Sequence, residues 1–411
     1  MKIKLHLLSK FNKFGISTQI YVILALACTF CGNTKLLKYV MVMLVLMIMT
    51  MILSRVFDRL GRDVIINKVN KNVPILLGIF TLFLIVQSYY AYNRGITQTY
   101  AFRYVIFTFL LIIIMKERVY SFLIALFKSY SWIAGLSSLI MTVVKGEKSG
   151  GILGNYQAVG MMMSIACIIF AIDYFQKNKG ISNFIGYLMS LACVFVSGKR
   201  TFALLAILAL IGMFVSTTEK NKVWKGLKIV LFLLLGMIGL YFMFSPVREL
   251  FDRIVQLSSG KNVYTMTSGR SGMWDVAMKI FDSNKWFGIG FANFAVYTGA
   301  FFNSESWSGL FLTHNIYYGL LSETGIIGFF IFVSFMLYSL LWSISRFREY
   351  KSLLSLDQKR ILFYSIFVQM WFVLYGFSGN GIYDSNECFF YITAIAMALS
   401  VIQTKKLNKV L

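Results

Sequence analysis

The chain has 411 residues, of which 58% are hydrophobic and only 14% are charged, and its mean hydropathy is +0.72. A soluble domain of this length does not need so many apolar residues, so the composition indicates an integral membrane protein. The net charge of +24 is also compatible with nucleic-acid binding, and the positions of the charges decide between these two classes.

Apolar stretches long enough to cross roughly 30 Å of hydrocarbon as helices recur along the whole sequence. They predict an all-α polytopic membrane protein in which residues 1–411 form a single integral membrane domain. Twelve transmembrane helices are expected, near residues 16–32, 36–54, 73–92, 100–115, 119–144, 156–171, 181–196, 201–216, 229–244, 325–342, 361–377 and 387–401.

Lys and Arg fall mostly on one side of this topology. With the N-terminus inside, well over half of the 40 Lys and Arg residues lie in the inner segments. This bias places both termini in the cytoplasm and the protein in the cytoplasmic membrane. Anionic lipid headgroups are sufficient partners for such a surface, so no nucleic acid is required.

The first apolar run and its cysteines have alternative interpretations. Lys2 and Lys4 precede an apolar run, as in a signal peptide, but the next span follows almost at once, so we expect an uncleaved first helix. Cys28 and Cys31 have CxxC spacing without a second pair or a nearby histidine. We therefore interpret them as small buried residues and not as a redox or zinc site.

Residues 245–313 form one long outer connection, which is neither apolar enough to span a membrane nor polar enough to be disordered. We expect it to fold against the membrane, where a bilayer-anchored substrate can meet polar residues. Within it, MWDVAMKIFD has the spacing of a helix that lies in the interface. Its apolar face comprises Trp274, Ala277, Met278 and Phe281, opposite Asp275, Lys279 and Asp282.

The segment VSGKRTF contains a predicted outer turn followed by the start of a helix. Ser197 and Gly198 form the turn, and Arg200 lies beside the unpaired N–H groups of the next helix. An arginine is electrostatically unfavourable there unless an anion is bound too, so we interpret Arg200 as part of an anion site. The alternative is a positive charge at the level of the lipid headgroups.

Arg270 follows a Ser-Gly turn in TSGRSGMW and opens the interfacial helix. Two arginines at helix N-termini on the outer side suit one diphosphate, because a planar guanidinium binds phosphate oxygens in pairs. Arg200 and Arg270 are therefore the predicted diphosphate-binding residues. The alternative is that Arg270 pairs with Asp275 or with a lipid headgroup.

The segment HNIYYGLLSETGIIG contains the candidate base. His314 is the one outer side chain expected to titrate near neutrality, which makes it the catalytic candidate, and Thr313 is the expected cap of the helix that follows. Asn315 is expected to cap that helix or to bind substrate. On an unbroken helix Glu323 lies half a turn out of phase with His314. Either Gly319 or a kink before Gly325 rotates the two together, or Glu323 accepts loop N–H groups, and we prefer the second role. Weaker substrate-binding candidates are Asn315, Trp274 and Glu323.

Carboxylates give little sign of a metal site. No DxD pair or cluster of outward carboxylates has the ligand density that Mg²⁺ or Mn²⁺ needs, so we expect neither a metal nor another cofactor. Asp384 and Glu387 come closest, and we assign them to the dipole of the last helix.

The motifs SGKRT, GRSGMW, FGIGFANF and HNIYYGLLSETGIIG together resemble those of the bacterial O-antigen ligase and O-antigen polymerase superfamily, over roughly residues 150–330. The resemblance implies a twelve-helix glycosyltransferase of the polytopic C type, which uses undecaprenyl-diphosphate-linked glycans as donor and acceptor on the outer face without a metal. It places Arg200 and Arg270 on the lipid diphosphate and His314 near the acceptor. A chain-length regulator is a further candidate partner.

Two reactions of this superfamily compete. A polymerase moves the growing chain onto the next lipid-linked repeat unit, whereas a ligase moves it onto lipid A core or another acceptor. We choose the polymerase, because polymerases are the more numerous and varied members. A flippase for lipid-linked oligosaccharides is the alternative from another class, and it should carry charged residues along its spans, where only Arg103 and Lys128 lie deep.

Overall fold

The computed structural model describes residues 70–117, 120–176, 180–207, 248, 270–301 and 312–408. The regular elements in these residues are all helices. The predicted spans near 16–32, 36–54 and 229–244, and much of the long loop 245–313, lie outside them. The chain divides into two compact units, each of which is described by itself.

Several described helices are long and apolar enough to cross a membrane. Five candidates are found among the described residues, at Arg94–Ile112, Leu123–Lys145, Tyr156–Phe175, Ile316–Tyr350 and Ser385–Ile402, and two shorter apolar helices are Asn72–Gln87 and Ile181–Val196. The prediction of an all-helical, multi-pass membrane protein is therefore confirmed. The number of twelve spans stays a prediction.

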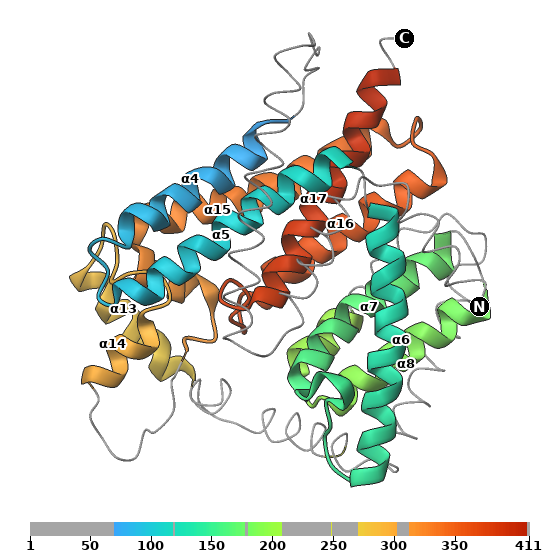
Figure 1. Ribbon diagram of the computed structural model, residues 1–411, viewed down its shortest axis with the longest axis horizontal. Coiled ribbons are helices and arrows are strands. Elements are labelled where there is room, and N and C mark those ends of the chain that lie inside the picture. Colours follow the sequence, from blue (N-terminus) through green and yellow to red (C-terminus); the bar gives the residue numbers. More distant parts are fainter. Residues whose placement is uncertain are drawn as a thin grey trace. The chain divides into compact units, whose positions relative to one another are not determined.

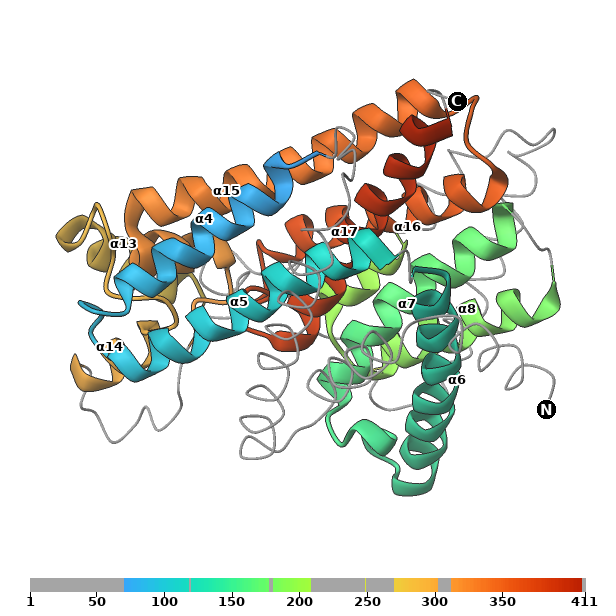
Figure 2. The same ribbon diagram turned by 45° about the horizontal axis from the view of Figure 1, so that its top comes forward.

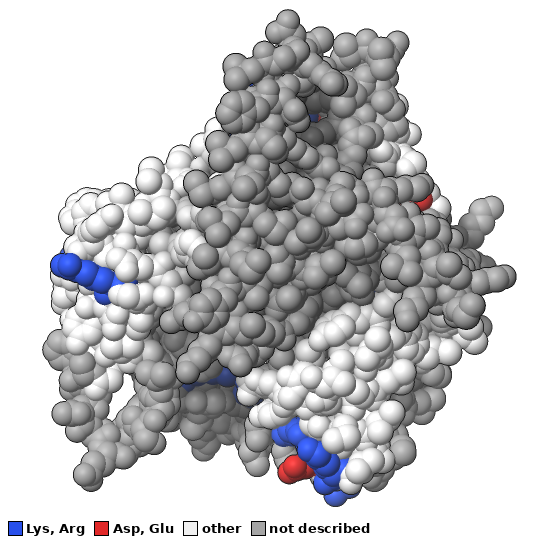
Figure 3. All heavy atoms as spheres, viewed as in Figure 1, with Lys and Arg blue, Asp and Glu red and all other residues white. Residues whose placement is uncertain are grey.

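Large apolar side chains are exposed on several of these helices, as expected where a helix meets lipid. Leu82, Val143, Phe330 and Leu341 each expose more than half of their surface, with values of 61%, 63%, 59% and 62%. In Figure 3 the described part of the visible face is mostly white, and charged atoms occupy only a few places on it. Such apolar surfaces need a cover, and the bilayer provides one.

The first unit contains helices α4 (Asn72–Gln87), α5 (Arg94–Glu117), α13 (Arg270–Ser283), α14 (Phe294–Phe301), α15 (Ile316–Tyr350) and α17 (Ser385–Asn408). Helix α4 packs along both α5 and α15, and α17 packs against α5 (Figures 1 and 2). Aromatic rings line the contacts of α4 with α15 and α5. The ring centroid of Phe80 lies 4.7 Å from that of Phe332 and 5.2 Å from that of Tyr104. The short helices α13 and α14 pack against α15.

Helix α13 confirms the helix predicted for MWDVAMKIFD, but its buried face is rotated from the predicted one. Ala277 and Ile280 are buried in a cluster that also includes Met273 and Val276, at positions i, i+3, i+4 and i+7. The predicted Met278 and Phe281 are only half-buried. The reason is that α13 packs against α15, so a protein surface, as well as the membrane, selects its apolar face.

The second unit contains α6 (Tyr120–Lys145), the short 3-10 helix η1 (Gly151–Leu153), α7 (Tyr156–Gln176), α8 (Ile181–Val196) and α16 (Leu356–Tyr375). Helix α7 packs against both α8 and α16. Helix α8 has the bounds that its apolar run predicts, and the next helix begins at Arg200. The turn between them is the predicted one, because Gly198 has a φ of 68° and its N–H donates to Phe195 O over 3.0 Å.

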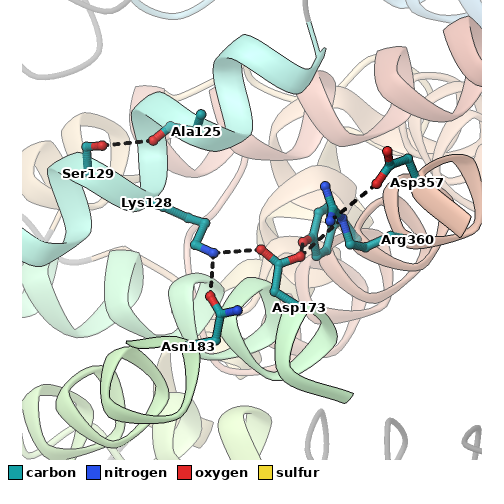
Figure 4. A network of polar contacts seen from close by, with 8 residues as sticks. Ala125, Lys128, Ser129, Asp173, Asn183, Asp357 and Arg360 are labelled. Carbon is teal, nitrogen blue, oxygen red and sulfur yellow. Dashed lines mark hydrogen bonds and ion pairs between the residues drawn. The ribbon is translucent and has the colours of Figure 1, made fainter. Parts of the chain in front are cut away.

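An ion network joins three helices of the second unit (Figure 4). The buried Asp173 of α7 accepts from Lys128 Nζ of α6 over 2.6 Å, and Arg360 Nε of α16 lies 3.1 Å from its other oxygen. Tyr364 also donates to Asp173, and Lys128 donates to Asn183 over 2.7 Å. The deep cation Lys128 therefore has a carboxylate partner within the helix bundle.

Candidate functional site

The site of the first unit is built where α15 begins. His314 is half-buried and has a φ of +49°, in the left-handed region that side chains rarely adopt, although His, Asn and Asp enter it more often than others. Its ring Nδ1 lies 3.1 Å from the amide Nδ2 of Asn380. Strained backbone of this kind is costly and is found preferentially at functional sites.

Asn315, and not Thr313, caps helix α15. The Asn315 side chain accepts from Tyr317 N over 3.0 Å and from Tyr318 N over 3.3 Å, with extended backbone angles at the cap. The Thr313 hydroxyl instead donates to Asn315 O over 2.8 Å. The expectation for Thr313 was wrong, because the left-handed turn at His314 moves the start of the helix two residues along. The carboxamide of Asn315 also donates to Phe377 O over 3.3 Å.

Helix α13 brings Arg270 and Trp274 to the same region. Arg270 donates to Ser378 O over 3.1 Å, and the indole N–H of Trp274 donates to Thr313 O over 2.9 Å. The Trp274 ring stacks on Tyr318, with centroids 5.5 Å apart and planes 12° apart. Trp274 therefore supports the turn that carries His314. This structural role accounts for the position of Trp274 without a contact to a sugar substrate.

The loop between α16 and α17, residues 376–384, holds these parts together. Ser378 O accepts from Arg270, Asn380 contacts His314, and Gly376 O accepts from Ile316 N over 2.8 Å. Sequence reasoning missed this loop, because it weighed only the carboxylates near its end. A polar, glycine-rich stretch between two outer ends of predicted spans, GFSGNGIYDSNE, is the signal that could have found it.

Glu323 anchors a second loop, as the phase argument predicted. Its carboxylate, fully buried, accepts from Ala292 N and Phe294 N over 2.8 Å each and from the Tyr383 hydroxyl over 2.7 Å. With three protein donors on two oxygens, we assign Glu323 to the fold and not to substrate binding. Burial, followed by the nearby Glu323 charge, raises the pKa of Tyr383 well above its usual range, so this phenol stays a donor.

Helix α15 is kinked at Gly325, where the loop with residues 286–293 packs against it. We call residues 286–293 together with 322–326 the loop–helix joint. Gly325 has a φ of 61° and a ψ of −169° inside α15, which frees carbonyls of the preceding turn. Ile289 N then donates to Ser322 O over 3.2 Å and Gly290 N to Glu323 O over 2.9 Å. The kink lies after Glu323, so it does not turn Glu323 toward His314.

Gln87 of α4 completes the loop–helix joint. The buried amide donates to Phe287 O over 2.5 Å and to Glu323 O over 2.7 Å, and its oxygen accepts from Phe291 N over 3.1 Å. A Cβ on Gly288 would lie 2.2 Å from the carbonyl carbon of Glu323, so a side chain does not fit there. The motifs FGIGFANF and ETGIIG are therefore two halves of one structural element.

Arg103 has partners within the first unit, and Arg200 lies in the second unit. Arg103 of α5 donates to Tyr383 O over 2.7 Å and lies 4.5 Å from the ring centroid of Tyr100. Arg200 belongs to the second unit, where it is half-buried at the start of its helix, as predicted. Its role in binding an anion stays a prediction.

The fold and the site define a class of protein: a multi-pass helical membrane protein with a polar site. The site combines a strained histidine, an arginine and a loop held by hydrogen bonds to its main chain. Residues 185–333 match the model of the O-antigen ligase family. This match confirms the resemblance to the O-antigen ligase and polymerase superfamily, and it spans Arg200, Arg270, His314 and Glu323. Comparison with curated proteins gives no match.

Proposed function

We propose that this protein polymerises undecaprenyl-diphosphate-linked oligosaccharide repeat units into a cell-surface polysaccharide, on the outer face of the cytoplasmic membrane. The observation that carries the proposal is that His314 and Arg270, both within the family-matched segment, contact the same loop, residues 376–384. A base and a guanidinium held near the same loop suit glycosyl transfer from a lipid diphosphate.

The reaction is an inverting displacement. A sugar hydroxyl of the acceptor attacks the anomeric carbon of the donor while His314 takes its proton, and the diphosphate leaves with the electron pair of the broken C–O bond. Arg200 and Arg270 are the residues proposed to stabilise the charge that develops on the diphosphate. The bond from Arg270 to Ser378 O supports this role, because it orients the planar guanidinium at the loop that also carries Asn380, the neighbour of His314.

A ligase is the second candidate, because the matching family model is described as that of an O-antigen ligase. The same site would then transfer the finished chain to lipid A core or another final acceptor. Among the described residues, Lys128 pairs with Asp173 and Arg103 with a carbonyl, so these two cations serve the fold. Neither of them supports the charged pathway that a flippase should carry along its spans.

Deletion of the gene, followed by electrophoresis of the surface glycan, separates the three functions. If the protein is a polymerase, the deletion strain should carry single repeat units at the surface. Loss of a ligase should leave full-length chains on the lipid carrier, and loss of a flippase should leave lipid-linked units trapped inside. We further expect the purified protein to act without a divalent metal. Complete loss of activity in EDTA, restored by Mg²⁺ alone, would overturn that part of the proposal.

A further inference from the structure

His314 has a polar neighbour, Asn380, whose two ends would have opposite effects on the imidazole ring. Asn380 Nδ2 lies 3.1 Å from His314 Nδ1, although 66 residues separate the two in sequence. The other end of the carboxamide, Oδ1, is buried and has no hydrogen-bond partner among the residues that the structure describes. Within the described part of the chain, no second hydrogen bond to the carboxamide therefore fixes which of its two ends faces the ring.

The chemistry of imidazole shows what each of the two orientations would do. A neutral ring carries one proton, and the partner of one nitrogen decides which nitrogen holds it. If the Asn380 amide group donates to Nδ1, the proton sits on Nε2, which then cannot accept another. A half-turn of the carboxamide about its last bond exchanges its ends, so that Oδ1 accepts from Nδ1–H and Nε2 keeps its lone pair.

We propose that Asn380 is a positioning residue, which holds His314 in the tautomer protonated on Nδ1 so that Nε2 accepts the proton of the attacking hydroxyl. This inference rests on the proposed glycosyl transfer. The hydroxyl gives its proton to Nε2 as its oxygen bonds to the anomeric carbon, and the electron pair of the old C–O bond leaves with the diphosphate. The ring then carries both protons, and Oδ1 still accepts from Nδ1–H.

The loop that carries Asn380 is fixed on both sides of it. On one side Ser378 O is held by Arg270, and Phe377 O is held by Asn315. On the other side Ile382 O accepts from the Tyr104 hydroxyl over 3.1 Å, and Tyr383 O accepts from Arg103. A positioning group acts well only when its own support is rigid, and this loop meets that condition.

An amide suits this task better than a carboxylate. Asn380 is neutral, so it selects the tautomer without placing a permanent negative charge beside the path of an anionic diphosphate. It also accepts from Nδ1–H before and after proton transfer, so no rearrangement is needed at the moment of reaction. The role is that of the group that orients the imidazole in a hydrolase triad, filled here by a residue from a separate loop.

The chain offers a direct test, because its two histidines are His6 and His314. A His6→Gln protein labelled with ¹⁵N-histidine has one labelled ring, and its nitrogen chemical shifts report the tautomer without any assay of activity. We expect the proton on Nδ1 in this parent. Asn380→Ala should shift the population toward Nε2–H and lower kcat by about 10²-fold, with KM within a few-fold of the parent.

Two further variants make the result specific. Asn380→Asp, which can also accept from Nδ1–H, should restore the parental tautomer and much of kcat. Asn386→Ala, the matched control at the start of α17, should change neither. A parent ring protonated on Nε2, or an Asn380→Ala protein with the parental tautomer and kcat, overturns the inference. If the parent makes no polymer from lipid-linked units, the proposed function fails instead, while the spectrum still decides the tautomer.

Discussion

Glu323 and Asp173 each organise a buried network, one in each unit, and they do so with different partners. Glu323 accepts from two main-chain N–H groups and a phenol, all of them neutral. Asp173 lies between two cations, Lys128 and Arg360. A carboxylate solvated by main-chain donors fixes backbone geometry, whereas one paired with flexible cations ties helices together. In the unit that carries His314 the buried carboxylate therefore holds main-chain geometry, whereas in the second unit it joins helices.

The largest effect that would separate the two units is on catalysis. His314→Asn keeps the left-handed turn, because Asn tolerates a positive φ, but it removes the base. Turnover of lipid-linked oligosaccharide in vesicles should fall by about 10²- to 10⁴-fold, with donor binding retained. His6→Gln is the matched control. A rate within a few-fold of the parent would show that the histidine serves only the turn.

The loop–helix joint should be the most sensitive structural element. Glu323→Gln places an NH₂ group where an oxygen accepts hydrogen bonds, so at least one buried donor loses its partner. The free energy of unfolding should fall by about 1–3 kcal/mol, measured as a lower melting temperature in detergent. Glu147→Gln, at an exposed glutamate, is the control. Equal melting temperatures for the two variants would contradict the role assigned to Glu323.

Substitution of Arg270 tests whether the first unit binds the diphosphate through the geometry of the guanidinium as well as through its charge. Arg270→Lys keeps the charge but loses the planar fork, so we expect at least about a tenfold loss of kcat/KM, or ~1.4 kcal/mol. Arg348→Lys at the exposed end of α15 should have no effect. Insertion into the membrane should be normal for both. A parental rate for Arg270→Lys would sink the proposed diphosphate contact.

The ion network of the second unit should give the smallest change. Lys128 and Arg360 are 22% and 17% exposed, so each cation keeps some access to water if Asp173 loses its charge. Asp173→Asn should cost about 1 kcal/mol, and high salt should shrink the difference, unlike that of Glu323→Gln. Arg346→Gln breaks a surface pair with Glu349 and should stay within about 0.5 kcal/mol of the parent. A salt-independent loss for Asp173→Asn would contradict the ionic character of the network.

Much of the helical framework followed from local composition. The bounds of α8, the turn at Gly198 and the helix opened by Arg270 were all predicted, because a run of apolar residues and a Ser-Gly turn determine them within a few neighbours. The phase of Glu323 relative to His314 was equally local, since it follows from the helical repeat.

Contacts between distant segments required the tertiary structure. Nothing near His314 in the sequence identifies Asn380 as its neighbour, and nothing near Glu323 identifies the N–H groups of residues 292 and 294. The cap at Asn315 and the buried face of α13 were also decided by packing, because left-handed backbone and helix contacts override local preference. Sequence determines where a helix can form, and burial against other segments decides which of its polar groups are brought together.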